Sequence, residues 1–214
     1  MKRFTLLTTL VLGLTGCQTA YYSAMEKVGI HKREILVDRV EDTKESQQES
    51  QQEFQSALER LSTLINFDGK ELQSVYEQLN DDYESSLASA QEVSANINKV
   101  EDVAQALFDE WQDELEQYSS AKLKRESDKK LKQTQRQFDK LLRSMRSSES
   151  KMQPVLASLK DNVLYLKHNL NAQAIAAIRG EFKSLQTDIQ SLINDMNRSI
   201  EDSNKFIAQM NTTN

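Results

Sequence analysis

The sequence contains very little proline and glycine. Of 214 residues one is proline and five are glycine, and only Gly69 and Gly180 lie between Leu36 and Asn214. Tight β-hairpin turns depend on these residue types, so we do not expect a chain this poor in them to form a sheet. Its 28% charged and 38% hydrophobic residues are typical of long amphipathic helices instead.

Cysteine is equally scarce. Cys17 is the single cysteine of the chain, which excludes an internal disulfide. A basic start, Lys2-Arg3, and a short apolar run from Phe4 to Leu14 precede it. This order is typical of a secretory signal peptide, and the run is too short to span a membrane. We therefore expect a signal peptide at residues 1–16 and one mature domain at residues 17–214.

The end of this segment, Leu14-Thr15-Gly16-Cys17, resembles the lipobox of bacterial lipoproteins, in which the cysteine thiol is acylated and becomes the new N-terminus. The next residue is Gln18 and not Asp, which in the Gram-negative sorting rule implies the outer membrane. The resemblance thus implies lipidation at Cys17 and a bacterial cell-envelope lipoprotein that faces the periplasm, with the membrane contacted through the lipid. An unmodified thiol after a signal peptide is the alternative.

Apolar residues recur at alternating spacings of four and three in four long segments. The clearest run begins at Leu72, passes Trp111 and reaches Tyr118, with an interruption only at Glu114. Such a run places a continuous line of apolar side chains, here called a seam, along one face of a helix. It predicts helices that pack knobs into holes. We expect helices at about residues 22–66, 69–118, 121–168 and 171–210.

Pro154 lies inside the third of these segments. An interior proline usually breaks or kinks a helix, but the heptad phase is the same on both sides of it. A chain-reversing loop would rarely preserve that phase, so we expect one kinked helix. Asp68 and Asn171 are the expected N-caps of the second and fourth helices.

The connections between these helices are short, which makes neighbours antiparallel. The sequence therefore predicts an all-α, elongated, coiled-coil-like four-helix bundle with up-down-up-down topology. Helices of about 40–50 residues would be roughly 60–75 Å long. Two long hairpins that dimerise are the alternative, because sustained heptads also serve intermolecular coiled coils.

The second and third helical segments carry opposite charge. Residues 68–116 hold fourteen acidic and two basic residues, whereas residues 122–146 hold ten basic and three acidic ones. One interpretation is that opposite flanking charges specify the pairing of these two helices. Another is a basic contact stripe for a partner or for anionic lipid head groups, since it lies at the same end as Cys17. The residues of this candidate stripe are Lys122, Lys124, Arg125, Lys129, Lys130, Lys132 and Arg136.

Nucleic acid is not an expected partner of the basic segment, because aromatic stacking residues are missing from its polar face and the compartment of a lipoprotein holds no genome. Histidine is also scarce: His31 and His168 are predicted at opposite ends of the bundle, too far apart to share a metal ion, and neither belongs to a Glu-x-x-His motif. Gly69-Lys70 lacks the flanking residues of a phosphate-binding loop. We therefore expect no enzymatic activity, no metal and no cofactor.

One layer near mid-height departs from the apolar pattern. If the loops align the helices, a set of mostly small or polar seam residues meets Ile189 there, namely Gln47, Ser50, Ser86, Ala90 and Ser148. Each missing leucine-sized side chain forgoes about 1.5–3 kcal/mol of burial. The layer is either a narrow waist where backbones approach closely or a cavity that accepts water or a ligand.

Three stretches are more specific than heptad spacing would dictate. They run from Tyr21 to Val40 (YYSAMEKVGIHKREILVDRV), from Leu107 to Trp111 (LFDEW) and from Pro154 to Asn171 (PVLASLKDNVLYLKHNLN). Together they resemble the uncharacterised bacterial family known as domain of unknown function 2959, over nearly all of the mature chain. The resemblance implies a helical secreted or lipid-anchored protein and supplies no catalytic or binding residues.

The functional expectation is a non-enzymatic, lipid-anchored scaffold, spacer or docking module at the periplasmic face of the outer membrane. Its partner would be another envelope protein or a second copy of itself. The alternative is a periplasmic carrier that binds a small apolar ligand in the mid-bundle layer.

Overall fold

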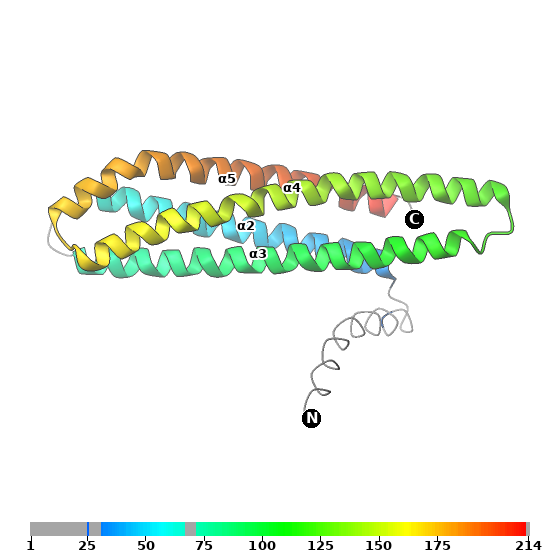
Figure 1. Ribbon diagram of the computed structural model, residues 1–214, viewed down its shortest axis with the longest axis horizontal. Coiled ribbons are helices and arrows are strands. Elements are labelled where there is room, and N and C mark those ends of the chain that lie inside the picture. Colours follow the sequence, from blue (N-terminus) through cyan, green and yellow to red (C-terminus); the bar gives the residue numbers. More distant parts are fainter. Residues whose placement is uncertain (1–24, 26–30, 67–71, 213–214) are drawn as a thin grey trace, which may run out of the picture.

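The computed structural model describes Met25 and residues 31–66 and 72–212. Apart from Met25, the described residues form four long helices and no strand: α2 (Lys32–Ile65), α3 (Leu72–Leu115), α4 (Ala121–His168) and α5 (Ala172–Thr212). Figure 1 shows them side by side in an elongated bundle. The predicted all-α four-helix bundle is confirmed. Cys17, the expected signal peptide and the expected N-cap Asp68 lie outside the described residues.

The helices form a ring in which each packs on two neighbours. Both α2 and α4 pack on α3 and α5, so that α2 and α4 face each other along one diagonal. Lys32 at the start of α2 pairs with Glu110 near the end of α3 at 2.9 Å, and Lys140 of α4 pairs with Asp202 of α5 at 2.8 Å. Neighbouring helices are therefore antiparallel, and the start of α2 shares one end of the bundle with the α3–α4 loop.

The seams predicted from the spacing form the core. On α2 the whole seam is buried, including the polar residues Thr43, Gln47 and Ser50 in its middle. On α4 every seam residue is buried, both before and after Pro154. Phe138 of α4 makes edge-on contacts with Phe108 of α3 and Phe206 of α5, at centroid distances of 5.6 and 6.1 Å. Such pairs stabilise a core beyond the area they bury, and these connect three of the four helices.

The helix ends differ from the expected bounds by a few residues. α3 ends at Leu115, not at residue 118, because the amides of Glu116 and Gln117 bond to carbonyl oxygens three residues back, the tightened turn that closes many helices. Tyr118 thus leaves the seam and is 40% exposed, and Leu115 takes the last core position. α5 runs on to Thr212, and the expected starts at 22 and 69 lie outside the described residues.

Two local predictions about helix boundaries hold. The Oδ1 atom of Asn171 accepts hydrogen bonds from the amides of Gln173 and Ala174 at 3.0 and 3.1 Å, which confirms Asn171 as the N-cap of α5. α4 continues through Pro154, so the segment is one helix and not two. Ser120, which the sequence analysis did not single out, caps the start of α4 by accepting from the amide of Leu123.

The hairpin of α3 and α4 extends beyond the other two helices. In Figure 1 the loop between them projects past the start of α2 and the end of α5. Within this overhanging hairpin, Trp111 Nε1 donates a hydrogen bond to Ser127 Oγ at 2.8 Å, and Leu115 is buried between the two helices. Among the described helices, α3 is therefore the one neighbour of the first turns of α4, where Lys122 and Arg125 are exposed.

Candidate functional site

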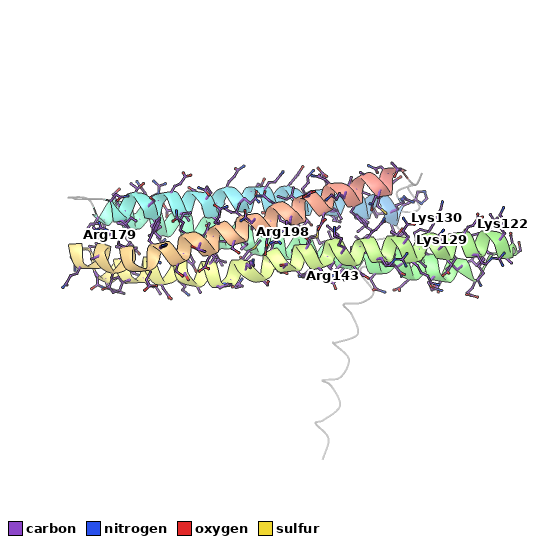
Figure 2. All side chains as sticks on the ribbon, turned by 90° about the horizontal axis from the view of Figure 1, so that it is seen from above. Lys122, Lys129, Lys130, Arg143, Arg179 and Arg198 are labelled. Atoms are coloured by element: carbon purple, nitrogen blue, oxygen red, sulfur yellow. The ribbon has the colours of Figure 1, made fainter. Side chains whose placement is uncertain are left out.

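The basic stripe begins on the overhanging part of α4 and ends at Arg136, two residues before Phe138, which contacts Phe206 of α5. Figure 2 shows Lys122, Lys129 and Lys130 together at that end of the helix. Six of the seven stripe residues are exposed, and Lys124 is half-buried. The structure therefore brings the predicted stripe residues together on one projecting helix, at the end where α2 begins.

Most of these cations have no anionic partner among the described residues. Lys124 pairs with Glu116 at 3.1 Å, beyond the end of α3, and Lys132 pairs with Asp128 of its own helix at 2.7 Å. Five stripe residues have no ion pair within the part of the chain that the structure describes, namely Lys122, Arg125, Lys129, Lys130 and Arg136. The charge of the stripe is thus largely available to a partner.

Arg146, farther along α4, shows the geometry of a cation that does connect the two helices. Its guanidinium bonds to Glu101 of α3 at 2.6 Å and to Glu149 of α4 at 2.8 Å. Desolvation by burial lowers the pKa of Arg146, but the hydrogen bonds to Glu149 and Glu101 outweigh it, so the pKa lies above its ordinary value. Pairing of α3 with α4 through charge therefore rests on Arg146 and Lys124, and not on the stripe as a whole.

The five residues of the predicted mid-bundle layer are all buried, with exposed fractions of 0–4%. Gln47 Nε2 donates to Ser148 Oγ at 2.9 Å along the α2–α4 diagonal, so these two residues lie at the same height. Ser50 accepts from Ser89 of α3 at 3.1 Å, whereas Ser86 donates to the Asp82 carbonyl within α3. The layer is therefore a set of short hydrogen-bonded contacts.

The α5 side of this layer differs from the expectation. Gln51 donates to Ile193 O and Asn197 Oδ1 at 3.2 and 3.0 Å, so the residues of α5 at this height are 193–197 and do not include Ile189. Asp195, which the heptad spacing did not predict as a buried residue, is 4% exposed and pairs with Lys151 at 2.6 Å and with Arg198. The one sequence signal for its burial is its position between two apolar residues of the seam, Leu192 and Met196.

The two histidines lie at opposite ends of the bundle, as expected. His31 directly precedes α2 and makes no side-chain cap, and His168 is the last residue of α4. Among the described residues no group of three or more His, Cys, Asp or Glu side chains could hold a metal ion. None of the described helices combines the length and the apolar character needed to cross a bilayer.

The fold and its surface define an elongated helical-bundle protein with a cationic, overhanging end. The chain matches the family described as a protein of unknown function, DUF2959, over residues 21–210, and it belongs to that family. The matched region includes α2, α3 and α4 in full and α5 as far as Met210. No curated protein and no solved structure matches the chain significantly.

Proposed function

We propose that this protein is a non-enzymatic scaffold, a spacer and docking module held at the periplasmic face of the outer membrane by lipid on Cys17. The observation that carries the proposal is the basic stripe, in which five cations of α4, most of them on its overhanging part, have no ion-pair partner in the described molecule. Charges in this setting speed the encounter with an oppositely charged surface and select the partner.

The geometry of the tether supports a spacer. Lys32 is the fifteenth residue after Cys17, and this length of chain spans at most roughly 50 Å. The start of α2 lies at the same end as the stripe, so a lipid on Cys17 would hold that end toward the membrane. The opposite end of α4 would then reach about 70 Å farther into the periplasm.

The partner that this surface fits best is an envelope protein with an acidic face. A second copy of the chain is the alternative, because α3 exposes many carboxylates of its own. In both cases the stripe supplies contact and orientation, and no chemical step is required of it.

Site-specific photo-crosslinking in cells tests the docking role. A photoreactive residue at position 130 is compared with one at position 160, where Lys160 is an exposed cation near the other end of the same helix. We expect a discrete product from position 130 only, and its loss when Lys122→Glu and Arg125→Glu are added. The mass of the product distinguishes an envelope protein from a second copy.

Two outcomes would contradict this proposal. One is the same set of products from positions 130 and 160, which indicates random collision. The other is a full-length Cys17→Ser variant that still sediments with membranes, which removes lipid as the sole anchor.

A carrier with a ligand in the mid-bundle layer is the second candidate function. Its support is that Gln47 Oε1 and Ser199 Oγ are buried without a hydrogen-bond partner among the described residues. Both atoms are polar, which favours a small polar occupant over an apolar ligand. Native mass spectrometry of protein purified from its own membrane separates the candidates, since a co-purifying small molecule supports the carrier and a co-purifying protein the scaffold.

A further inference from the structure

Two buried polar atoms near mid-height have no hydrogen-bond partner among the described residues. They are Oε1 of Gln47 on α2 and Oγ of Ser199 on α5, and both side chains are fully buried. Leaving a buried polar atom unpaired is unfavourable, so protein interiors pair such atoms with protein groups or with ordered water. A third atom of this kind, Oδ1 of Asp195, is already contacted by Arg198.

Gln47 and Ser199 lie at the same height of the bundle. Gln51 of α2 donates to Asn197 Oδ1 of α5 at 3.0 Å, and Gln47 lies one turn before Gln51. Because α2 and α5 are antiparallel, the α5 residues beside Gln47 are those at about 197–201, which include Ser199.

The contact between α4 and α5 gives the same placement. Lys151 of α4 pairs with Asp195 of α5 at 2.6 Å. Ser148 lies about one turn before Lys151 on α4. Ser199 lies one turn after Asp195 on the antiparallel α5, so the two serines are at about the same height. Since Ser148 accepts from Gln47 Nε2 at 2.9 Å, three helices contribute a polar side chain to one layer.

The other hydroxyl groups around this layer cannot donate to Gln47. Thr43, Ser148 and Ser203 are fully buried, and each hydroxyl already donates to a backbone carbonyl of its own helix at 2.8–2.9 Å. They therefore keep only the capacity to accept. The Ser199 hydroxyl is the remaining donor among them, and it makes no hydrogen bond in the described structure. Gln47 Oε1 thus needs a donor that no neighbouring hydroxyl supplies.

From these observations we propose that the layer binds one buried water molecule, which bridges Gln47 Oε1 and Ser199 Oγ. The water donates one proton to Gln47 Oε1 and accepts the hydroxyl proton of Ser199. Its second proton is donated to Ser148 Oγ, which has a lone pair left after accepting from Gln47. A buried water usually makes about three hydrogen bonds, and this site supplies that number.

The bridging water links α5 to the opposite pair of helices. The direct bond between Gln47 and Ser148 joins α2 to α4 across the bundle axis and does not involve α5. One water that also bonds to Ser199 connects three helices at one height, which fixes the axial position of α5. This site is independent of the docking role proposed for the stripe, and it fills the layer that the carrier candidate assigns to another ligand.

Oxygen-17 relaxation dispersion of the full-length protein in detergent tests the proposal, because it counts the water molecules that stay inside a protein longer than the protein takes to tumble. Ser199→Val should remove one such water per chain, since it deletes the hydroxyl and fills the space with methyl groups. The matched control is Ser86→Val. Ser86 is also fully buried, but its hydroxyl already donates to the Asp82 carbonyl at 2.8 Å, so the count should stay unchanged.

Gln47→Leu provides a second variant in case Ser199→Val fails to fold. It deletes the acceptor and should remove the same water. The proposal is overturned if the count is equal in wild type and Gln47→Leu, or if it falls equally in Ser199→Val and Ser86→Val.

Native mass spectrometry of protein from its own membrane separates water from another occupant. A small molecule that is bound to the wild type and absent from Ser199→Val would overturn the proposal in favour of the carrier. Crosslinking from position 130 should be the same in wild type and Ser199→Val, so that loss of the water site and loss of the docking role are distinguished.

Discussion

Gln47 and Ser148, 101 residues apart in the chain, form a hydrogen bond of 2.9 Å across the centre of the bundle. Both side chains are fully buried, and they come from the diagonal pair α2 and α4, which are not direct neighbours in the ring. The short serine side chain leaves room for glutamine to cross the axis. A single polar contact inside an apolar seam specifies register at some cost in stability, which is the role we expect for this pair.

Ser148→Ala should destabilise the protein by about 1–3 kcal/mol, because it leaves the buried Nε2 of Gln47 without an acceptor. The double variant Gln47→Leu/Ser148→Ala removes both polar groups and should recover most of that loss. Urea unfolding followed by circular dichroism measures both changes and that of Gln47→Leu alone. Strict additivity of the two single substitutions, within about 0.5 kcal/mol, would show that the residues are not coupled.

Heptad spacing predicted which face of each helix is buried, but not how far each helix slides along its neighbours. The seam through Pro154 and the cap at Asn171 follow from local chemistry, and both are found as expected. The height of Ile189 differs from the expected one, because the axial offset between helices depends on loop lengths and on packing at the ends. The overhang of α3 and α4, which leaves Tyr118 exposed, has the same origin.

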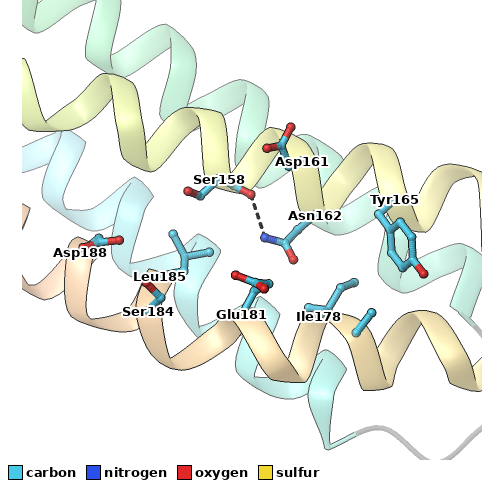
Figure 3. Close-up of a pocket in the computed structure, with 10 residues that line it drawn as sticks. Ser158, Asp161, Asn162, Tyr165, Ile178, Glu181, Ser184, Leu185 and Asp188 are labelled. Atoms are coloured by element: carbon cyan, nitrogen blue, oxygen red, sulfur yellow. Dashed lines mark hydrogen bonds between the residues drawn. The ribbon is translucent and has the colours of Figure 1, made fainter.

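For the candidate sites, too, one part follows from local sequence and the other depends on how the helices are offset. The sequence identifies the stripe as a run of cations, but whether Lys129 or Arg146 finds a carboxylate depends on the offset between α3 and α4. The groove of about 370 Å³ between α4 and α5, which Asp161, Glu181 and Asp188 line (Figure 3), could not be predicted at all. Its two sides come from separate helices, and each side alone, such as Glu181 and Asp188, reads as an ordinary solvated helix face.

Pro154→Ala should stabilise the bundle. The proline is exposed and interrupts the backbone hydrogen bonding of α4, and alanine restores the N–H donor and favours the helix, with an upper bound of about 3 kcal/mol. Thermal unfolding measures the change, and Gln153→Ala, at the adjacent exposed position, is the control with an expected shift below about 0.5 kcal/mol. A fall in melting temperature for Pro154→Ala would mean that the core is fitted to a proline-bent helix.

Asp195→Asn should cost about 1.5–3 kcal/mol, because Asp195 is 4% exposed and accepts charge-assisted contacts from Lys151 and Arg198. Asp128→Asn is the matched control, since it breaks the exposed pair with Lys132 within one helix and should cost at most about 0.5 kcal/mol. Denaturant unfolding of both variants measures the difference. Equal effects would indicate that burial adds nothing to the Asp195 pairs.

Neutralising the stripe should leave the stability of the bundle almost unchanged. Lys122, Arg125, Lys129 and Lys130 have no ion pair in the described structure, so their joint replacement by glutamine removes no internal contact, and we expect a change within about 0.5 kcal/mol. Arg146→Gln instead removes contacts to Glu101 and Glu149 and should cost about 1 kcal/mol.

The pH dependence gives a further check on this contrast. Because the pKa of Arg146 is raised, its contribution is complete at every pH below its ordinary value and is lost only as the pH rises through the raised one. The difference between wild type and Arg146→Gln should therefore stay constant across the neutral range, as measured by urea unfolding at several pH values. If neutralising the stripe destabilises the bundle as much as Arg146→Gln does, its cations serve helix pairing, and the case for a docking surface is lost.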